Sequence, residues 1–315
     1  MNSTQPKFTI VSASRNEEVD ISMAIESMLG QTYPNVEIII VDDSTDSTQE
    51  KIKSFASRGV KLIDGPRKGC CAARNLGIQN ATGDIIMFVN ADARLAPDFM
   101  ERVAKHYAEG ADWVVVKSRA FNLENVYARF VQAQADKEED LPAYSPYTTE
   151  GYSCRREIIL KAGLITLCNA PLNFCTDWTL GKKITELGIA KKVFDRNIIA
   201  NHKAPDHFEE YWQVRKTRGY LSAVVAHYLL KESLPYLFVK FLVKDAIFIL
   251  RFGLIIPAAY HVAKICQYSA KPVRDFFPFF WTYFLQEFSR VIGEWEGMGR
   301  IIKALKHESI KTIEH

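Results

Sequence analysis

The first half of the chain alternates short apolar runs with stretches in which apolar residues recur at helical spacing. The apolar runs predict strands at Phe8–Val11, Val36–Val41, Val60–Ile63 and Ile85–Val89. Helices are predicted between them, beginning with Val19–Leu29, where the apolar residues form one stripe. Strands that alternate with helices form a mostly parallel sheet with helices on both faces. The pattern therefore predicts an α/β fold.

A less regular alternation continues to about residue 200. It predicts further helices over residues 97–110, 122–140 and 177–188, and strands at Trp113–Lys117 and Ala190–Phe194. Beyond Glu209 the sequence becomes helical and rich in aromatic residues. We therefore predict two domains, an α/β domain over residues 1–220 and an aromatic-rich helical region over residues 221–315.

Composition narrows the function classes. The chain has 315 residues, of which 48% are hydrophobic, and its net charge is +3, so it can build a full core and bulk disorder is excluded. No basic tract is interleaved with aromatic residues, which argues against a nucleic-acid partner. The six cysteines form no C-x-x-C pair, and no basic-then-apolar leader precedes Phe8. A cytoplasmic location is expected.

Short polar motifs lie at or near the ends of the predicted strands. In open α/β sheets, ligands bind in the crevice beyond the carboxyl ends of the strands. A single aspartate in such a place is more often a helix cap than a ligand. Five motifs in order carry more weight, and they span residues Ala13–Glu17, Asp42–Asp46, Ala73–Asn75, Asn90–Asp92 and Thr176–Asp177.

In this order and spacing, the motifs resemble the inverting family 2 glycosyltransferases of the GT-A fold, over about residues 7–220. The resemblance rests on the S-R-N-E, I-I-V-D-D-S-T-D, A-A-R-N-L-G and G-D-I-I-M-F-V-N-A-D stretches. It implies a Rossmann-like GT-A sheet and the transfer of a sugar from a nucleoside diphosphate sugar. It also implies a single displacement that inverts the anomeric carbon.

The resemblance assigns donor-binding roles. Asp42 or Asp43 would accept hydrogen bonds from the base or ribose, and Arg74 would lie near the base or phosphates, where its planar charged fork suits the task. The end of the first strand would line the nucleotide pocket with Ala13, Ser14 and Glu17.

A divalent metal, Mg²⁺ or Mn²⁺, is also implied. Asp92 matches the last carboxylate of the family's D-x-D element and would hold the ion against the diphosphate. Asn90 departs from that element, because the family usually has Asp there; an amide can still accept a ribose hydroxyl but adds no charge. His202 matches a family histidine near the metal, although a lone loop histidine is also an ordinary surface residue.

Asp177 takes the place of the catalytic base, which removes the proton from the attacking acceptor hydroxyl. The alternative is that Asp177 only caps the helix that begins at Trp178. Arg215 and Arg218, three residues apart on a predicted helix, share a face and could meet the donor diphosphate or an anionic acceptor. A solvated basic face explains them equally well.

The C-terminal region contains two aromatic-rich stretches, Leu234–Gln267 and Asp275–Trp295. Charged residues interrupt the first and Pro257 divides it, leaving less than the roughly 18–20 apolar residues that cross a bilayer. Such helices suit a peripheral position at the inner face of the cell membrane, and the acceptor would then be a sugar, a lipid-linked glycan or a polysaccharide. A helical subdomain that packs on the sheet or forms a homodimer is the alternative.

Two other functions fit the same residues less well. A sugar-phosphate nucleotidyltransferase normally begins with a glycine-rich basic phosphate loop, whereas Ser12–Glu18 has no glycine and one arginine. A nucleotide-sugar binding module that has lost turnover is suggested by Asn90.

Overall fold

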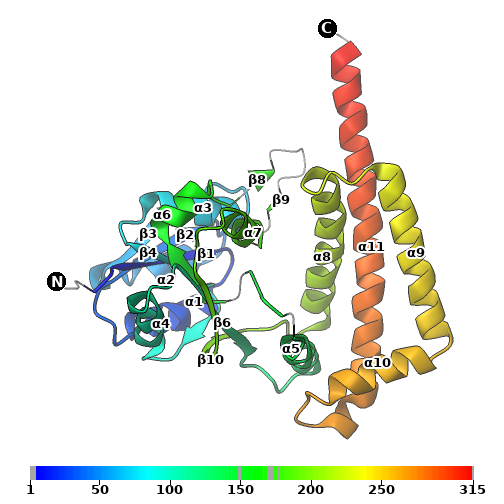
Figure 1. The fold of residues 1–315 in the computed structure, drawn as a ribbon, viewed down its shortest axis with the longest axis horizontal. Coiled ribbons are helices and arrows are strands. Elements are labelled where there is room, and N and C mark those ends of the chain that lie inside the picture. Colours follow the sequence, from blue (N-terminus) through cyan, green and yellow to red (C-terminus); the bar gives the residue numbers. More distant parts are fainter. Residues whose placement is uncertain are drawn as a thin grey trace. The chain divides into compact units, whose positions relative to one another are not determined.

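The computed structural model describes residues 5–142, 144–147, 150–165, 167–168, 174–175 and 178–313. Within them the chain forms two compact units (Figure 1). The first unit holds the residues up to Phe121 together with Ser145–Leu167 and Cys175–Lys203. The second holds Asn122–Tyr144 and the chain from Ala204 onward.

The first unit is built on an eight-stranded sheet in the order β3-β2-β1-β4-β7-β6-β10-β5. Its strands are β1 (Phe8–Ser14), β2 (Val36–Asp42), β3 (Val60–Asp64), β4 (Ile85–Phe88), β5 (Arg94–Leu95), β6 (Trp113–Ala120), β7 (Ser153–Arg155) and β10 (Lys192–His202). The pairs β1–β2, β2–β3, β1–β4 and β6–β10 are parallel, whereas β7 is antiparallel to β4 and β6, and β5 to β10. Six of these strands therefore point the same way, and β5 and β7 are reversed. Two short strands, β8 (Leu167–Cys168) and β9 (Phe174–Cys175), pair separately.

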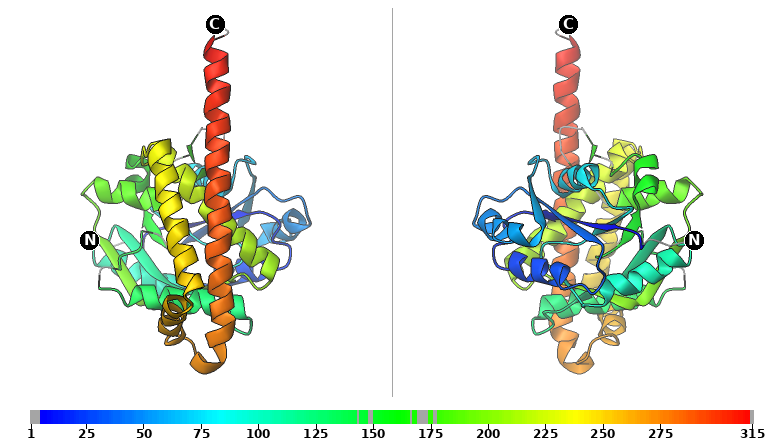
Figure 2. Two further views of the ribbon diagram at one scale, coloured as in Figure 1. Left: turned by 90° about the vertical axis from the view of Figure 1, so that its right-hand side faces the viewer. Right: turned by 90° about the vertical axis from the view of Figure 1, so that its left-hand side faces the viewer.

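Helices cover both faces of this sheet, as the right-hand view of Figure 2 also shows. They are α1 (Ile21–Leu29), α2 (Thr48–Lys53), α3 (Cys70–Asn80), α4 (Phe99–Ala108), α6 (Arg156–Lys161) and α7 (Trp178–Glu186), with the short 3₁₀ helix η1 (Ala56–Arg58). Successive residues of a strand point to opposite faces of the sheet and so pack into two different cores. Ile10, Ile38 and Met87 pack with α1 and α4, whereas Val11, Ile39 and Phe88 pack with α3, α6 and α7. Burial on both faces explains why these strands read as continuous apolar runs.

The predicted α/β fold with a mostly parallel sheet and helices on both faces is confirmed. Two local predictions were incomplete. Strand β5 has only two residues, too few for a periodic signal, and it was not predicted. The strand predicted at Ala190–Phe194 runs on to His202 as β10, across an irregularity between Asp195 and Ile199 that breaks the alternation.

The second unit is helical, and its long helices lie side by side in Figure 1. It contains α5 (Val126–Glu139), α8 (Phe208–Tyr228), α9 (Leu234–Gly253), α10 (Ile256–Cys266) and α11 (Pro272–Ile313). Its core combines aromatic and aliphatic residues of α5, α8, α10 and α11, including Phe130, Tyr211, Val262 and Phe279. Buried Asp275 at the start of α11 accepts hydrogen bonds from Arg129 of α5, at 2.9–3.2 Å.

Glycines allow α8 and α11 to cross closely. A Cβ on Gly293 would lie 2.0 Å from the Lys216 carbonyl oxygen, and one on Gly219 would lie 2.3 Å from that of Arg290. No real Cβ makes such contacts, so larger side chains would push the two helices apart. Within the described ranges, no helix is both long enough and apolar enough to span a membrane.

These compact units do not follow the predicted ranges 1–220 and 221–315. The predicted boundary falls inside α8 (Phe208–Tyr228), and α5 belongs to the helical unit although it lies within residues 1–220. Composition changes near Glu209, but the contacts that group α5 with later helices carry no local sequence signal. The domain ranges themselves stay a prediction.

One buried carboxylate joins three segments of the first unit at the amino end of the sheet. Glu37 of β2 accepts hydrogen bonds from Thr9 of β1 (2.7 Å), from the Thr82 amide (2.8 Å) and from Lys61 of β3 (2.5 Å). Burial alone would raise the pKa of Glu37, but these hydrogen bonds outweigh it and lower the pKa from 4.5 to about 2. The ionised form is therefore the stable one in the folded chain.

Because the folded pKa lies below the unfolded one, the stability from Glu37 is present above about pH 4.5 and is lost as the pH falls toward about 2. We expect Glu37→Gln to lower the free energy of unfolding at pH 7 by on the order of 3 kcal/mol and to flatten its acid dependence. Urea denaturation at pH 7 and at pH 3 measures the free energy of unfolding and its dependence on acid. Glu26→Gln is the control, because its ion pair with Arg58 is solvent-exposed and should change little. An unchanged acid slope in Glu37→Gln would contradict this account.

Candidate functional site

The parallel register brings the carboxyl ends of several strands to one edge of the sheet. Ser14, Asp42 and Asp64, the last residues of β1, β2 and β3, lie directly opposite one another. Phe88, the last residue of β4, pairs with Val11 of β1, so Asn90 follows at the same edge. The polar motifs after these strands are thereby gathered where ligands bind in open α/β sheets.

Asp42 is buried and serves the loop that follows β2. One carboxylate oxygen accepts hydrogen bonds from the hydroxyls of Ser14 and Ser44, and the other accepts from the Ser44 amide at 3.0 Å. Asp43 is half-buried, and its Oδ1 accepts from the Arg67 amide at 2.8 Å. Asp42 therefore holds the loop in place, and Asp43 is the more accessible of the two carboxylates.

The segment after β1 clamps the segment after β2. Asn16 lies in the left-handed region with φ 58°, which an asparagine tolerates better than most residues. Its amide donates to Ser44 Oγ at 2.7 Å and its Oδ1 accepts from the Thr45 amide at 2.9 Å. The amide of Glu17 donates to Thr48 Oγ1 at 2.9 Å. The predicted residues Ala13, Ser14 and Glu17 thus share one edge with Asp42 and Asp43.

Arg74 projects from α3 to the end of β4. Its guanidinium donates to Asn90 Oδ1 at 2.7 Å and lies over the Phe88 ring, 5.7 Å from the ring centre. Helix α3 packs tightly enough to fix this direction, because a Cβ on Gly77 would come within 2.4 Å of Val11. Since Asn90 is neutral, the contact orients the guanidinium without forming an ion pair.

Glu150 is a residue at this edge that the sequence did not predict. Its Oε1 accepts a hydrogen bond from the Asn90 amide at 2.6 Å, just ahead of β7. The neighbouring backbone is tied to β4 as well, since Gly151 donates to the Phe88 carbonyl at 3.0 Å. Because β7 is antiparallel, its preceding loop reaches the carboxyl edge of β4, and only the direction of β7 could have revealed this.

The turn that carries Asp92 is joined to the end of β10. Ala93 donates to the Asn90 carbonyl at 3.2 Å, and β5 then pairs antiparallel with β10 through Arg94 and Asn201. Continuing this register places residue 93 opposite residue 202. Asp92 is therefore brought to the strand end that carries His202, whose Nδ1 lies 3.1 Å from Ser118 Oγ.

His202 was predicted in a loop after a strand ending at Phe194; it is the last residue of β10 instead. Nearby, Asp20 at the start of α1 is buried and forms ion pairs with Lys203 (3.1 Å) and Arg94 (3.6 Å). These contacts fix β5, and with it the turn of Asp92. Among the residues that the structure describes, no group of three or more His, Cys, Asp or Glu side chains is arranged to hold a metal.

Three predicted residues lie outside the described part of the first unit. Asp177, the predicted base, lies outside the described residues; α7 begins at the next residue, Trp178, as predicted. Arg215 and Arg218 lie on α8 in the second unit. Arg215 is buried with its guanidinium 5.1 Å from the Tyr211 ring centre, and Arg218 is exposed. Their role toward the donor stays a prediction.

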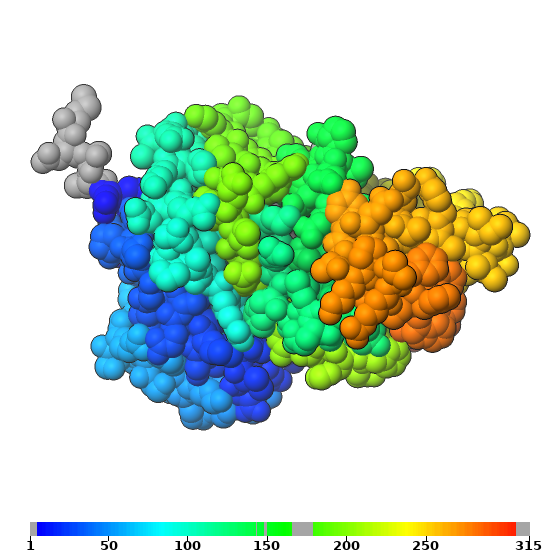
Figure 3. Space-filling view, turned by 90° about the horizontal axis from the view of Figure 1, so that it is seen from below, coloured from blue at the N-terminus to red at the C-terminus, as the bar shows by residue number. Residues whose placement is uncertain are grey.

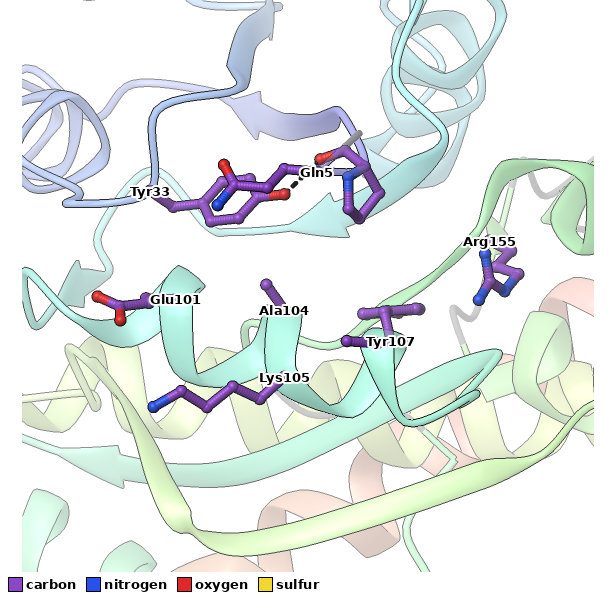
Figure 4. Close-up of a pocket in the computed structure, with 9 residues that line it drawn as sticks. Gln5, Tyr33, Glu101, Ala104, Lys105, Tyr107 and Arg155 are labelled. Atoms are coloured by element: carbon purple, nitrogen blue, oxygen red, sulfur yellow. Dashed lines mark hydrogen bonds between the residues drawn. The ribbon is translucent and has the colours of Figure 1, made fainter. Parts of the chain in front are cut away.

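A hollow of about 490 Å³ lies elsewhere on the first unit (Figure 4). It is lined by α4 on one side and by Gln5, Pro6 and Tyr33 on the other. Gln5 and Tyr33 precede β1 and β2, so the hollow is at the amino edge of these strands. None of the predicted site residues lines it, and it is not the candidate site.

The motifs at the carboxyl edge lie in a part of the chain that matches a known protein family. The model of "Glycosyl transferase family 2" matches residues 9–163, which include every motif from the first strand to Asp92. Glycosyltransferase GlyA of Streptococcus pneumoniae is 33% identical over 120 residues, 37% of this chain and 17% of the relative. The Escherichia coli enzyme WfgD, a UDP-Glc:α-D-GlcNAc-diphosphoundecaprenol β-1,3-glucosyltransferase, is 38% identical over 86 residues, 27% of this chain and 34% of the relative. The chain thus spans about a sixth of the first of these relatives and about a third of the second.

The fold also matches a solved structure over most of its length. The mannosyltransferase PcManGT from Pyrobaculum calidifontis, in complex with GDP-Man and Mn²⁺, has a TM-score of 0.61 and 17% identity, covering 94% of this chain and 88% of that one. At this identity the likeness concerns the fold, which is that of the GT-A glycosyltransferases. By these comparisons, residues 9–163 match glycosyl transferase family 2, and the fold is that of the GT-A glycosyltransferases.

Proposed function

We propose that the chain is an inverting glycosyltransferase that moves a sugar from a nucleoside diphosphate sugar to an acceptor hydroxyl. The observation that carries this proposal is the contact between Arg74 and Asn90, beside the turn of Asp92, at the carboxyl edge of the sheet. A permanent cation and a carboxylate at the same edge of the sheet suit a metal-bound diphosphate. The family match over residues 9–163 also supports a glycosyltransferase.

The loops that follow β1 and β2 would hold the donor. Asp43, more accessible than Asp42, would accept hydrogen bonds from the base or ribose. Asp42 would act through the loop it holds, because both its oxygens already accept hydrogen bonds within the chain. Arg74 would meet the phosphates, and Asn90 would orient the guanidinium.

Asp92 and His202 are the residues that would hold Mg²⁺ or Mn²⁺. The side chains fit, because Mg²⁺ sites in phosphate-handling enzymes commonly use one or two protein carboxylates and take other ligands from the phosphates and water. PcManGT, with the same fold, was solved with Mn²⁺ and GDP-Man. When bound, the ion would neutralise charge that develops on the leaving diphosphate.

Asp177 would take the proton from the acceptor hydroxyl as that oxygen attacks the anomeric carbon from the face opposite the leaving group. One carboxylate suffices for a single displacement, and the configuration inverts. We take the acceptor class from the relative WfgD, whose name specifies a sugar carried on diphosphoundecaprenol. We extend to this chain a lipid-linked or polysaccharide acceptor at the inner face of the cell membrane.

A binding module without turnover is the second candidate, and Asn90 is the observation that favours it. The amide in place of the usual carboxylate reduces the negative charge available to a metal. Donor binding without any transfer would support this candidate over the enzyme.

The first expected outcome concerns donor binding. A nucleoside diphosphate sugar should raise the melting midpoint, more strongly with Mn²⁺ than without, because it binds the folded state. Arg74→Ala should weaken donor binding by about tenfold or more, and Arg74→Lys should restore only part of it, since lysine lacks the planar fork. A thermal-shift panel of UDP- and GDP-sugars measures both. Arg58→Ala, at a surface ion pair, is the control, and equal donor shifts in Arg74→Ala would contradict the assignment.

Gly65→Ala tests the position of Asp43. A Cβ at residue 65 would lie 2.2 Å from Asp43 Oδ1 and 2.9 Å from the Asp42 carbonyl oxygen, so the Asp43 side chain must move. We expect a loss of about 1–3 kcal/mol of stability and weaker donor binding. Gly299→Ala is the matched control, because an added Cβ there meets nothing within 4 Å. Donor affinity unchanged in Gly65→Ala would remove Asp43 from the donor site.

Asp177→Asn separates chemistry from binding. Transfer should fall by roughly 10²-fold or more, whereas the donor-induced midpoint shift should persist. Initial rates with a measured acceptor and the thermal shift of the same preparation give the two readouts. Normal turnover in this variant would show that another group is the base.

A further inference from the structure

The half of α9 that faces away from the second unit is wholly apolar. Each exposed residue of this helix is apolar or glycine: Pro235, Tyr236, Phe238, Val239, Leu242, Val243, Ala246, Ile247, Ile249, Leu250 and Gly253. A helix on a protein surface normally turns charged residues to water and apolar ones to the core. Here the outward positions are the apolar ones.

The charged residues of α9 are turned inward and are paired. Lys244 contacts buried Glu294 of α11 at 2.7 Å, and Asp245 accepts a hydrogen bond from Trp295 Nε1 at 2.7 Å. Lys240 pairs with Glu232 at 2.8 Å, and Arg251 donates to the Tyr283 hydroxyl. The sequence therefore interrupts the apolar stretch with charges, but the fold gives each of these side chains a partner and leaves it only partly exposed.

The connection between α9 and α10 forms an apolar corner. Leu254, Ile255 and Ile256 are 64%, 60% and 78% exposed. Ile255 has φ 60°, a conformation that is costly for a β-branched residue. Strain of this kind persists where surroundings or function require it, and here it holds three large aliphatic side chains out from the chain.

A stripe on α11 extends the same surface. Val273, Phe277 and Trp281 are 90%, 80% and 59% exposed and recur every four residues along one face. Trp281 stacks on Phe284, which packs against Phe248 and Phe252 of α9. The left-hand view of Figure 2 shows α9 and α11 side by side. We call the exposed residues of α9, the corner and this stripe the apolar outer face.

Within the segment from Leu254 to Trp281, the exposed charged residues are all positive. Between Leu254 and Trp281 the only acidic residue is Asp275, which is buried against Arg129. Lys264, Lys271 and Arg274 are exposed. This segment lies at the molecular surface, in orange in Figure 3.

We propose that the apolar outer face docks on an anionic lipid bilayer, with the corner at Leu254–Ile256 entering the acyl boundary. Aliphatic and aromatic side chains gain by leaving water, and the three cations meet the headgroups of anionic lipids. A second copy of the chain is less suited to this face. In a two-fold dimer the same patch would meet itself and bring like charges together. This inference does not depend on the proposed function.

Flotation of the full chain with vesicles tests the docking. Vesicles of phosphatidylcholine with 30% phosphatidylglycerol (on the order of cellular anionic content) should carry the protein, and pure phosphatidylcholine should carry much less. The double variant Leu254→Ser/Ile256→Ser should bind on the order of tenfold more weakly or worse, because two buried aliphatic side chains are lost. Ile189→Ser, at an exposed aliphatic residue of the first unit, is the matched control and should bind normally.

The charge requirement has its own variant. Lys264→Gln/Lys271→Gln should weaken binding by roughly fivefold per lysine, and the wild-type protein should show a matching loss at high salt. All substituted positions are exposed, so melting midpoints should stay near that of the wild type. Flotation that is absent for the wild type, or that is unchanged in both double variants, would overturn the proposal. A dimer that Leu254→Ser/Ile256→Ser dissolves, without vesicle binding, would assign the face to a second copy.

Discussion

The structure depends on one constraint: the central strands are buried on both faces and hydrogen-bonded on both edges. β1 pairs with β2 on one side and with β4 on the other, and its side chains enter two separate cores. A polar side chain in such a strand has no water and few partners, so it costs stability unless it is hydrogen-bonded. The polar motifs are therefore concentrated at the strand ends. Glu37 is a charged residue within a strand, and it is tolerated there because several donors surround it.

The same constraint explains why the sequence predicted so much of the candidate edge. Continuous apolar runs identified β1, β2, β3 and β4, and the residues just after each run had to meet at one edge once the strands were parallel. Arg74 and Asn90, sixteen positions apart in the chain, were predicted as neighbours in function and are in hydrogen-bond contact. The strand positions and their common direction predict that Asn90 lies at this edge, whereas the role of Arg74 beside it was implied by the resemblance to family 2 glycosyltransferases.

What the sequence did not predict depends on contacts between distant segments. Strand β5 is defined by two residues that pair with β10, and the position of Asp92 follows from that pairing. Glu150 reaches Asn90 because β7 runs against its neighbours. Asp20 forms ion pairs with Lys203 and Arg94, which lie far from it in the sequence. None of these has a local period or motif, so only the folded chain reveals them. Helix α5 is similar, because its packing partners lie on α8, α10 and α11, far later in the chain.

Helix α9 reverses the usual division of polar and apolar surface, and the glycines of the neighbouring helices help to explain how it can. Gly219 and Gly293 let α8 and α11 approach backbone to backbone, so α11 gains much of its packing from one side. Its other neighbour, α9, buries Leu237 and Phe241 on its inward face. On the same helix Lys244 forms an ion pair with Glu294, and Asp245 accepts a hydrogen bond from Trp295. Charges that are taken out of water are tolerated when they are well paired, as Lys244 and Asp245 are. A bilayer docked as proposed above would cover the apolar half of α9 and contact the cations beside it. The outward apolar residues of α9 would then face lipid, and the rest of the helical unit would face water or its own core.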